Sequence, residues 1–547
     1  MAAPAGNVET PPRRRVRRRI AAAAADDGGE VDDDGLSVLP DELLLVILGR
    51  LDTRTALAAA ALSRRLDRLA REIPALVFSV RDVLPPRYHA CVRAHGDAAG
   101  ADARKLDAAI GRCERRAIRG FADCVSAFME PRVAVAPRRA RSLRLEFFAA
   151  RSTGFVEDLI AMAVGAWGVE DLDITVVKPA LVEQGPCYAF CFPDHRLSAE
   201  SLRSRIRSLA VSNCFLPPPS ELRHYAALTK LVLQDTHPRT PLAFYRQVLD
   251  ACPRLRALHL RRCGAPWYAA LVVDGMPELR ELVVDGCGFH TVDLRAAPAL
   301  ERVACVDGPV ALAFGGAPRL ARLSLTYALD DRLVLVRNWR LSGLLGDAPA
   351  MAELLVRFTG EPKWMTSGPL RSPLPGLRRL VVADMPSNWD VSWPRVILEA
   401  APCLEVLHIH VQEEEDDAGT TAAAAAEIPW PPAESARHER LAELAVVGFA
   451  ETRGQVGFVR HVVEACVALR RVVLVRRGRV VVGSEGRYWD WKLVAAEAAA
   501  PREGEVGGGG GDGERPTAAA EWSEVEKMVI RSQVKSASRP DVEVFIG

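Results

Sequence analysis

A leucine pattern that returns along most of this 547-residue chain constrains its fold more than any other feature. The clearest copies read Leu-x-x-Leu-x-Leu-x-x-Cys over 255–263 and Leu-x-x-Leu-x-Val-x-x-Cys over 279–287. Most successive copies begin roughly 20 to 31 residues apart, which is the period of a stacked-repeat architecture. Further copies begin at Ile206, Leu228, Leu300, Leu320, Met351, Leu377, Leu404, Leu441 and Leu469, and weaker ones at Leu143 and Val169.

Each copy predicts one short strand whose core face cannot be buried by that copy alone. Two side chains at a spacing of two point to the same face of a strand. The closing cysteine, as at Cys214, Cys263 and Cys287, is expected to be a small buried side chain. Because stacked copies share one core, we expect an α/β fold of the leucine-rich-repeat type, a curved solenoid with a short-stranded parallel sheet. Helices such as 244–251 and 396–400 are expected on its convex side.

The front of the chain predicts three short helices. Pro40 suits the first position of a helix, and Asp41 and Glu42 place negative charge where the helix dipole favours it. Thr53 is expected to cap the second helix and Ser63 the third. The leucines of this stretch form a broad apolar face, which three short helices bury poorly among themselves.

This stretch resembles the F-box, the helical module that binds a Skp-type adaptor of a cullin-based ubiquitin ligase. The resemblance rests on three short runs, 39–43, 51–57 and 61–65. Plant F-boxes usually carry tryptophan one place after the last arginine, where this chain has Leu66. The resemblance implies an adaptor-binding face, with Arg65 at its polar rim, made by Leu39, Pro40, Leu43, Leu44, Ile47, Leu48, Leu51, Leu57 and Leu62. The plainer alternative is a helical hairpin that caps a larger domain.

The C-terminal part resembles that of plant F-box proteins with leucine-rich repeats, often called the FBD type. The run 462–466 leading to Leu469 agrees with this, as do a helix led by Trp522 and a closing strand over 542–546. Together with the F-box, the resemblance spans most of the chain.

These features divide the chain into six parts. The array is expected to be interrupted by an acidic and alanine-rich loop over 411–432. In chain order we expect a disordered tail over 1–35, the F-box over 36–80, a connecting helical segment over 81–135, the repeat array over 136–480, a flexible linker over 481–517, and a C-terminal helix and strand over 518–547.

Composition limits the binding partners and the cellular locations that we expect for the chain. The formal net charge is +1, so bulk charge gives no reason to expect nucleic acid as a partner. No apolar run is long enough for a membrane-spanning helix, and the start lacks a secretory signal pattern. The 12 cysteines lack paired spacing, which indicates reduced thiols and a location in the nucleus and/or cytoplasm. The arginines within 13–19 are either a nuclear localisation signal or part of a solvated tail.

Motifs for catalysis are not found in the sequence. It has neither a phosphate-binding glycine-rich loop nor a His-Glu-x-x-His zinc helix. Cys187, Cys191 and His195 come nearest to a metal site, but their spacing does not match zinc fingers, and a buried or loop cysteine pair is the simpler interpretation. His408 and His410 share one strand face and are expected at the surface. We therefore expect no cofactor, no metal and no catalytic residue.

The hypothesis that follows is a non-catalytic substrate-recognition subunit of a Skp–cullin–F-box ubiquitin ligase. The resemblance implies a Skp-type adaptor and, through it, a cullin as partners, while the array would position an unidentified target protein. One alternative is a leucine-rich-repeat scaffold without a ligase partner. Another is a nuclear nucleic-acid binder led by the arginine cluster, which the balanced net charge argues against.

Overall fold

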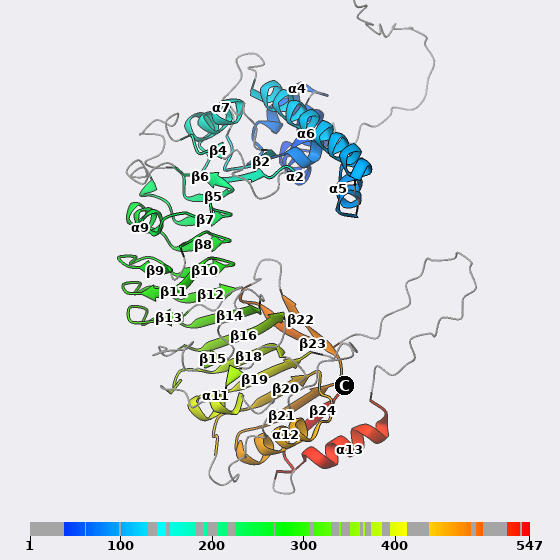
Figure 1. Ribbon diagram of the computed structural model, residues 1–547, viewed down its shortest axis with the longest axis vertical. Helices are drawn as coiled ribbons and strands as arrows, with labels where there is room; N and C mark the ends of the chain where they lie inside the picture. Colours follow the sequence, from blue (N-terminus) through cyan, green and yellow to red (C-terminus); the bar gives the residue numbers. More distant parts are fainter. Residues whose placement is uncertain are drawn as a thin grey trace, which may run out of the picture.

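The computed structural model of the chain describes most of the array and both of its ends (Figure 1). The expected tail over 1–35 and the loop residues 413–432 lie outside the described residues, as do Cys187 and His195. The described residues are 38–60, 62–97, 100–129, 139–148, 154–181, 190–193, 205–216, 225–266, 269–306, 311–329, 339–340, 351–360, 365–366, 373–385, 394–412, 437–482, 488–495, 522–535 and 539–547.

A 15-stranded sheet runs through the whole molecule, and every neighbouring pair of its strands is parallel. Its strand order follows the chain, which confirms the predicted solenoid with a short-stranded parallel sheet. The strands are β1 (Ala75–Ser79), β2 (Ser142–Phe148), β3 (Asp171–Val177), β5 (Ser208–Ser212), β7 (Lys230–Gln234), β8 (Ala257–Arg261), β10 (Glu281–Asp285), β12 (Arg302–Val306), β14 (Arg322–Leu329), β16 (Glu353–Gly360), β18 (Arg379–Met385), β19 (Val406–Val411), β20 (Glu443–Val447), β21 (Arg471–Val475) and β24 (Glu543–Ile546).

The strands stack into an open arc with the long sheet on its inner side (Figure 1). Helices α9 (Leu242–Ala251), α11 (Pro394–Ala400) and α12 (Arg453–Ala465) lie on the outer side, in agreement with the helices predicted there.

Between β8 and β14 the outer side carries strands instead of helices. β9 (Ala269–Val273), β11 (Phe289–Leu294) and β13 (Ala311–Ala313) form a separate three-stranded sheet. Every second residue of β9 is buried, a period of two that suits a strand and not a helix. Two-stranded sheets pair β4 (Phe190–Cys191) with β6 (Cys214–Phe215), and β15 (Trp339–Arg340) with β17 (Met365–Thr366).

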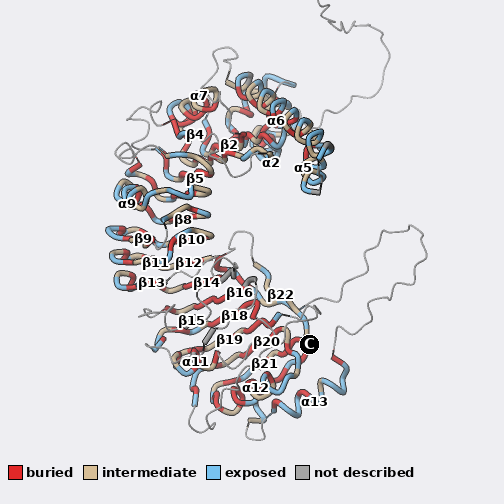
Figure 2. Tube along the Cα trace, viewed as in Figure 1, coloured by how far each residue is buried: buried red, intermediate tan, exposed pale blue. Residues whose placement is uncertain are grey.

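In-register stacking explains why the leucine pattern recurs. Leu258 on β8 pairs with Leu282 on β10, which pairs with Val303 on β12, and all three side chains are buried. One continuous apolar core therefore extends from Leu76 to Ile546, and Figure 2 shows buried residues along strands throughout the arc. Each repeat is stabilised by its neighbours and not by itself.

The corners after β8 and β10 explain the cysteines there: Cys263 is buried as predicted, whereas Cys287 is only partly buried, as is Cys214, which lies on β6. The thiol of Cys263 donates a hydrogen bond to the Leu233 carbonyl at 3.3 Å, and the thiol of Cys287 donates to the Leu260 carbonyl at 3.3 Å. The thiols thus satisfy a carbonyl of the preceding repeat as well as filling the corner. The residue directly after the strand has a positive φ at Asn213, Asp235, Arg262, Gly286 and Gly448.

The predicted front helices form as α2 (Asp41–Arg50), α3 (Thr53–Ala60) and α4 (Arg64–Ala70). Ser63 caps α4 as predicted, because its hydroxyl accepts from the Leu66 N–H at 3.1 Å. The predicted cap at Thr53 is wrong: Asp52 accepts from the Thr55 N–H at 2.8 Å, and Thr53 is a buried residue of the helix itself. The small core of this unit consists of Leu44, Leu48, Ala56, Ala60, Leu69, Ala70 and Ile73.

The array begins earlier than the predicted boundary at 136. Strand β1 lies within the segment 36–80 assigned to the F-box, yet its Leu76 is fully buried and pairs with Leu143 of β2. The connecting segment is therefore an insertion between the first two strands. It contains the short 3-10 helix η1 (Val80–Val83), α5 (Arg87–Asp97) and the long α6 (Gly100–Met129), whereas α7 (Gly154–Met162) and the π-helical η2 (Ala163–Trp167) connect β2 to β3.

Part of the predicted linker over 481–517 is a hairpin. β22 (Gly478–Val482) and β23 (Trp491–Ala495) are antiparallel, and Trp491 is buried against the sheet. A flexible segment would leave such a large apolar side chain in water. The chain ends with α13 (Glu524–Val534), which starts with a capping box at Ser523, and with the last strand of the long sheet.

Candidate functional site

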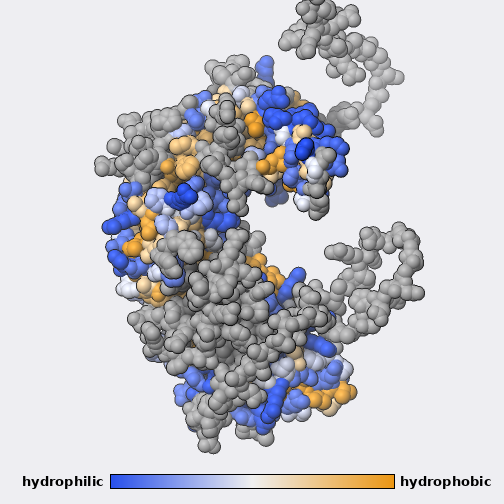
Figure 3. All heavy atoms as spheres, in the orientation of Figure 1, coloured by the Kyte–Doolittle hydropathy of each residue, from blue (hydrophilic) through white to orange (hydrophobic). Residues whose placement is uncertain are grey.

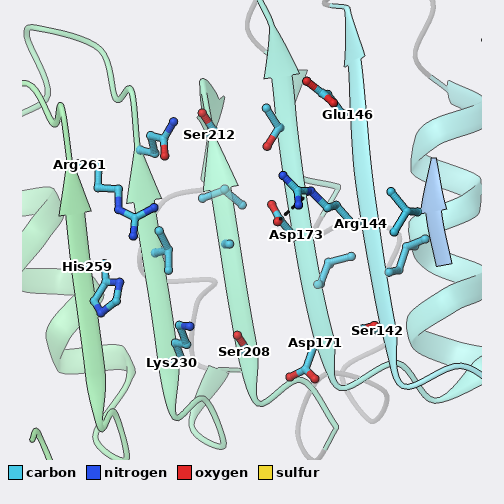
Figure 4. Close-up of a pocket in the computed structure, with 18 of the residues that line it drawn as sticks. Ser142, Arg144, Glu146, Asp171, Asp173, Ser208, Ser212, Lys230, His259 and Arg261 are labelled. Carbon is cyan, nitrogen blue, oxygen red and sulfur yellow. Dashed lines mark ion pairs between the residues drawn. The ribbon is translucent and has the colours of Figure 1, made fainter. Parts of the chain in front are cut away.

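The concave face carries a polar groove over the first half of the sheet. Its volume is about 880 Å³, and strands β2 to β8 supply most of its floor (Figure 4). Because the strands are in register, their outward side chains form rows across the face. The central row reads Arg144, Asp173, Ala210, Val232 and His259.

Most charged groups of the groove compensate one another. The Arg144 Nε lies 3.5 Å from the Asp173 Oδ2, and the two side chains point toward each other in Figure 4. Burial raises the pKa of Asp173, and the Arg144 charge opposes this rise. The hydrogen bond between His259 and Glu281, at 2.6 Å, holds the pKa of the Glu281 carboxyl below its usual value. Arg302 also binds Glu281, at 2.7 Å.

Two cations of the groove are not compensated in this way. Neither Lys230 nor Arg261 forms an ion pair with any carboxylate in the described ranges. The Arg261 Nε is buried without a hydrogen-bond partner, while its guanidinium lies 5.7 Å from the centre of the Tyr488 ring. In Figure 4, Lys230 and Arg261 lie at opposite ends of their neighbouring strands. These groups can bind acidic or carbonyl groups of a ligand.

The β22–β23 segment closes the middle of the concave face. The Tyr488 hydroxyl donates to the Asp285 carboxylate at 2.6 Å, and Tyr488 and Trp489 cover Val283 and Ala304. Trp491 packs farther along the face on residues of β16 and β18. The apolar centre of the array is therefore occupied by its own chain, and the polar groove ends at this aromatic wall.

The front helices expose several of the residues assigned to adaptor binding and bury two of them. Leu43, Ile47, Leu51 and Leu62 are between 39% and 80% exposed. Pro40 is also exposed, while Leu39 and Leu57 are partly buried. We call the exposed apolar residues Val38, Leu43, Val46, Ile47, Leu51 and Leu62 the N-terminal apolar surface.

Leu44 and Leu48 do not belong to any surface, because each is 3% exposed inside the small core of the helical unit. Their assignment to a partner-binding face is corrected accordingly. Val38 and Val46 were missed by the sequence interpretation, although Val46 follows Leu43 by three positions on the same helix face.

Arg65 joins two helices of the same unit. Its Nε donates to the Asp41 Oδ1 at 2.7 Å, and its other guanidinium nitrogen donates to the Leu39 carbonyl. The hydrogen bond from Arg65 lowers the pKa of the Asp41 carboxyl. Arg65 thus holds the start of α2 against α4.

The described residues contain neither a metal-binding cluster nor a membrane-spanning helix. Among the described residues, no group of three or more histidine, cysteine or acidic side chains is arranged to hold a metal ion. None of the helices in the described part combines the length and hydropathy needed to cross a membrane. Cys191 is exposed on β4. His410, expected at the surface, is buried, and His408 is partly buried beside Glu443 at 2.8 Å.

A family model described as "At1g61320/AtMIF1, LRR domain" matches residues 139–482. The chain belongs to this family. The match runs from just before β2 to the end of β22, so it covers most of the residues that line the concave groove and leaves out Tyr488, the front helices and the C-terminal helix. Membership of this leucine-rich-repeat family supports a protein-binding role for the array.

No curated protein matches the chain. Among solved structures, the chain is similar to "Crystal structure of TLR13-ssRNA13 complex", with 12% sequence identity and a TM-score of 0.25. The likeness covers 62% of this chain and 56% of the length of that one. A TM-score this low says nothing about how the elements of this chain are arranged.

Proposed function

We propose that the protein is the substrate-recognition subunit of a Skp–cullin–F-box ubiquitin ligase. The front helices would bind the Skp-type adaptor and, through it, the cullin, while the concave groove would hold a target protein. The chain itself would contribute no catalytic step, because its role is to position the target for ubiquitin transfer.

The N-terminal apolar surface is the observation that supports this proposal most strongly. Six of the fifteen large apolar side chains that are exposed among the described residues lie between positions 38 and 62. Fully burying one such side chain is worth about 1.5 to 3 kcal/mol, so a cluster of them favours a protein partner. The front helices α2, α3 and α4 also lie at one end of the arc, beside α6, and do not fill the concave face (Figure 1).

The groove would supply the second binding surface. Its carboxylates Asp173 and Glu281 already have cationic partners, whereas Lys230 and Arg261 form no ion pair with any carboxylate in the described residues. A target segment lying across β5 to β8 would reach both cations and the aromatic wall at Tyr488.

Co-expression of the full-length chain with a Skp-type adaptor tests the adaptor contact. The variant Leu43→Asp/Ile47→Asp should lose the adaptor in a pull-down, because two charges would enter an apolar interface. The matched control is Val525→Asp/Met528→Asp, which places the same charges on exposed apolar positions of α13 at the far end of the arc. The control should retain the adaptor.

Undiminished recovery of the adaptor with Leu43→Asp/Ile47→Asp would contradict the proposed contact. A second candidate function is a leucine-rich-repeat scaffold without a ligase partner, in which the front helices only cap the array. The family match favours it in one respect, since the match begins at residue 139 and does not include those helices. Absence of adaptor binding by the folded wild-type chain would support that scaffold instead.

A further inference from the structure

The long helix α6 carries four arginines along one face. Arg112, Arg115, Arg116 and Arg119 are spaced i, i+3, i+4 and i+7, which places them on one side of the helix. Arg87 of the neighbouring α5 faces the same space, and the five arginines line a hollow of about 390 Å³. We call this site the arginine hollow. Hydrophilic residues dominate the visible surface over α5 and α6 (Figure 3).

The arginine hollow concentrates positive charge that its surroundings do not neutralise. Its five arginines form no ion pair with any carboxylate in the part of the chain that the structure describes. On the long sheet, by contrast, Arg144, Arg302 and Arg322 each pair with a carboxylate of a neighbouring strand. The chain as a whole is balanced, with 71 basic and 70 acidic side chains. The hollow is therefore a local excess of positive charge, and ion pairs within the described part of the fold do not account for it.

Two of these arginine side chains lie along the helix. The Arg119 Nε donates to the Arg115 carbonyl at 3.4 Å. Gly111 leaves room for the Arg115 guanidinium, since a Cβ at this position would lie 3.3 Å from the Arg115 Nη1. The floor between the arginines is closed by the buried side chain of Cys113. The hydrogen bond of Arg119 thus provides a small part of the ordering needed to bind an anion.

We propose that the arginine hollow binds a compact anion that carries several phosphate groups. Guanidinium groups pair with phosphate oxygens through two parallel hydrogen bonds, which lysine cannot do. The volume of the hollow lies at the lower end of the range for small-ligand sites. The arginine stripe extends over about 10 Å, seven residues at 1.5 Å each, which suits two or three adjacent phosphates and is short for the track of a nucleic-acid duplex. This inference does not depend on the proposed ligase role.

Titration of the full-length protein with inorganic tripolyphosphate tests the proposal by calorimetry. We expect saturable binding that weakens as the salt concentration rises, because the exposed arginines are screened by salt. Arg112→Gln/Arg116→Gln should weaken binding at least about tenfold, which corresponds to about 1.4 kcal/mol. The matched control Arg93→Gln/Arg104→Gln removes the same charge from α5 and α6 outside the hollow and should stay within about twofold of the wild type.

Thermal unfolding of both variants provides the folding check, and neither should melt earlier than the wild type. Sedimentation with phosphatidylcholine vesicles containing phosphatidylinositol 4,5-bisphosphate separates the two sources of phosphate. Vesicle binding that tripolyphosphate displaces would identify a lipid headgroup, and tripolyphosphate binding without vesicle binding would identify a soluble ligand. The proposal is overturned if neither probe binds, or if Arg112→Gln/Arg116→Gln binds as well as the control.

Discussion

Replacing Trp491 with alanine should release the β22–β23 hairpin from the concave face and leave the array folded. Trp491 is 3% exposed, and its ring packs on Leu355, Val381 and Ala383. A buried tryptophan removes about 200 Å² from water, worth about 5 kcal/mol at 25 cal/mol per Å². Truncation of such a side chain typically costs about 3 to 5 kcal/mol. Because an isolated two-stranded hairpin is marginally stable, a loss of this size should detach it.

Hydrogen exchange followed by mass spectrometry measures this loss locally. Amides over 478–482 and 491–495 should exchange faster in Trp491→Ala, while β10 to β18 keep their protection, since repeats are stabilised by their neighbours. Val481→Ala is the control, because Val481 belongs to the same hairpin but is 37% exposed. Unchanged protection of the hairpin would refute the anchoring role of Trp491. Loss of protection across the whole array would refute the expectation that the hairpin can detach while the sheet stays folded.

Three further predictions concern other parts of the fold. Gly478→Ala should lower the stability of the same hairpin by about 1 to 3 kcal/mol, because the added Cβ would lie 2.3 Å from the Val447 Cγ1 and 2.6 Å from the Val494 carbonyl oxygen. Urea denaturation and hydrogen exchange would measure this loss. Leu44→Asp should unfold the front helices but not the array, which circular dichroism and limited proteolysis would show, since Leu44 lies in the separate small core. Burial raises the pKa of the thiols of Cys252, Cys305 and Cys466 to about 12. Thiols in the unfolded chain titrate near pH 8.5, so the contribution of these buried thiols to stability is fully present below about pH 8.5. Above that pH the unfolding free energy should fall by about 1.4 kcal/mol per pH unit for each thiol. Urea denaturation at pH 8 and at higher pH would measure this fall.

The array was predictable from the sequence because each repeat contains the full pattern of its own strand. Leu255 to Leu260 shows the turn residue and both core residues of β8 within six positions, and the pairing partner follows one period later. The first strand lacks this advantage. Its partner β2 follows only after α5 and α6, so Leu76 and Phe78 show no neighbouring copy at the repeat period.

The hairpin and the exposed side of α2 depend on contacts that a local pattern does not contain. Tyr488 bonds Asp285, which lies 203 positions earlier in the chain. The cluster of aromatic residues over 488–491, in a chain with 6% aromatic residues, was the available signal for burial. Similarly, Leu43 and Leu44 are adjacent leucines in one helix, and only the packing of α3 and α4 decides that Leu44 is buried and Leu43 is exposed.

The hairpin also determines what the concave face can bind. If the array ended at β21, its middle would present the apolar surface of Val283, Leu355 and Val381, which would favour an apolar partner. With the hairpin in place this surface is closed, and the open part of the face is the polar groove that ends at Tyr488. The same tyrosine lies beside the Arg261 guanidinium, whose Nε remains buried without a hydrogen-bond partner. Selection of a ligand therefore shifts from hydrophobic area to polar complementarity, because the open part of the face carries Lys230 and Arg261, which form no ion pair with any carboxylate that the structure describes.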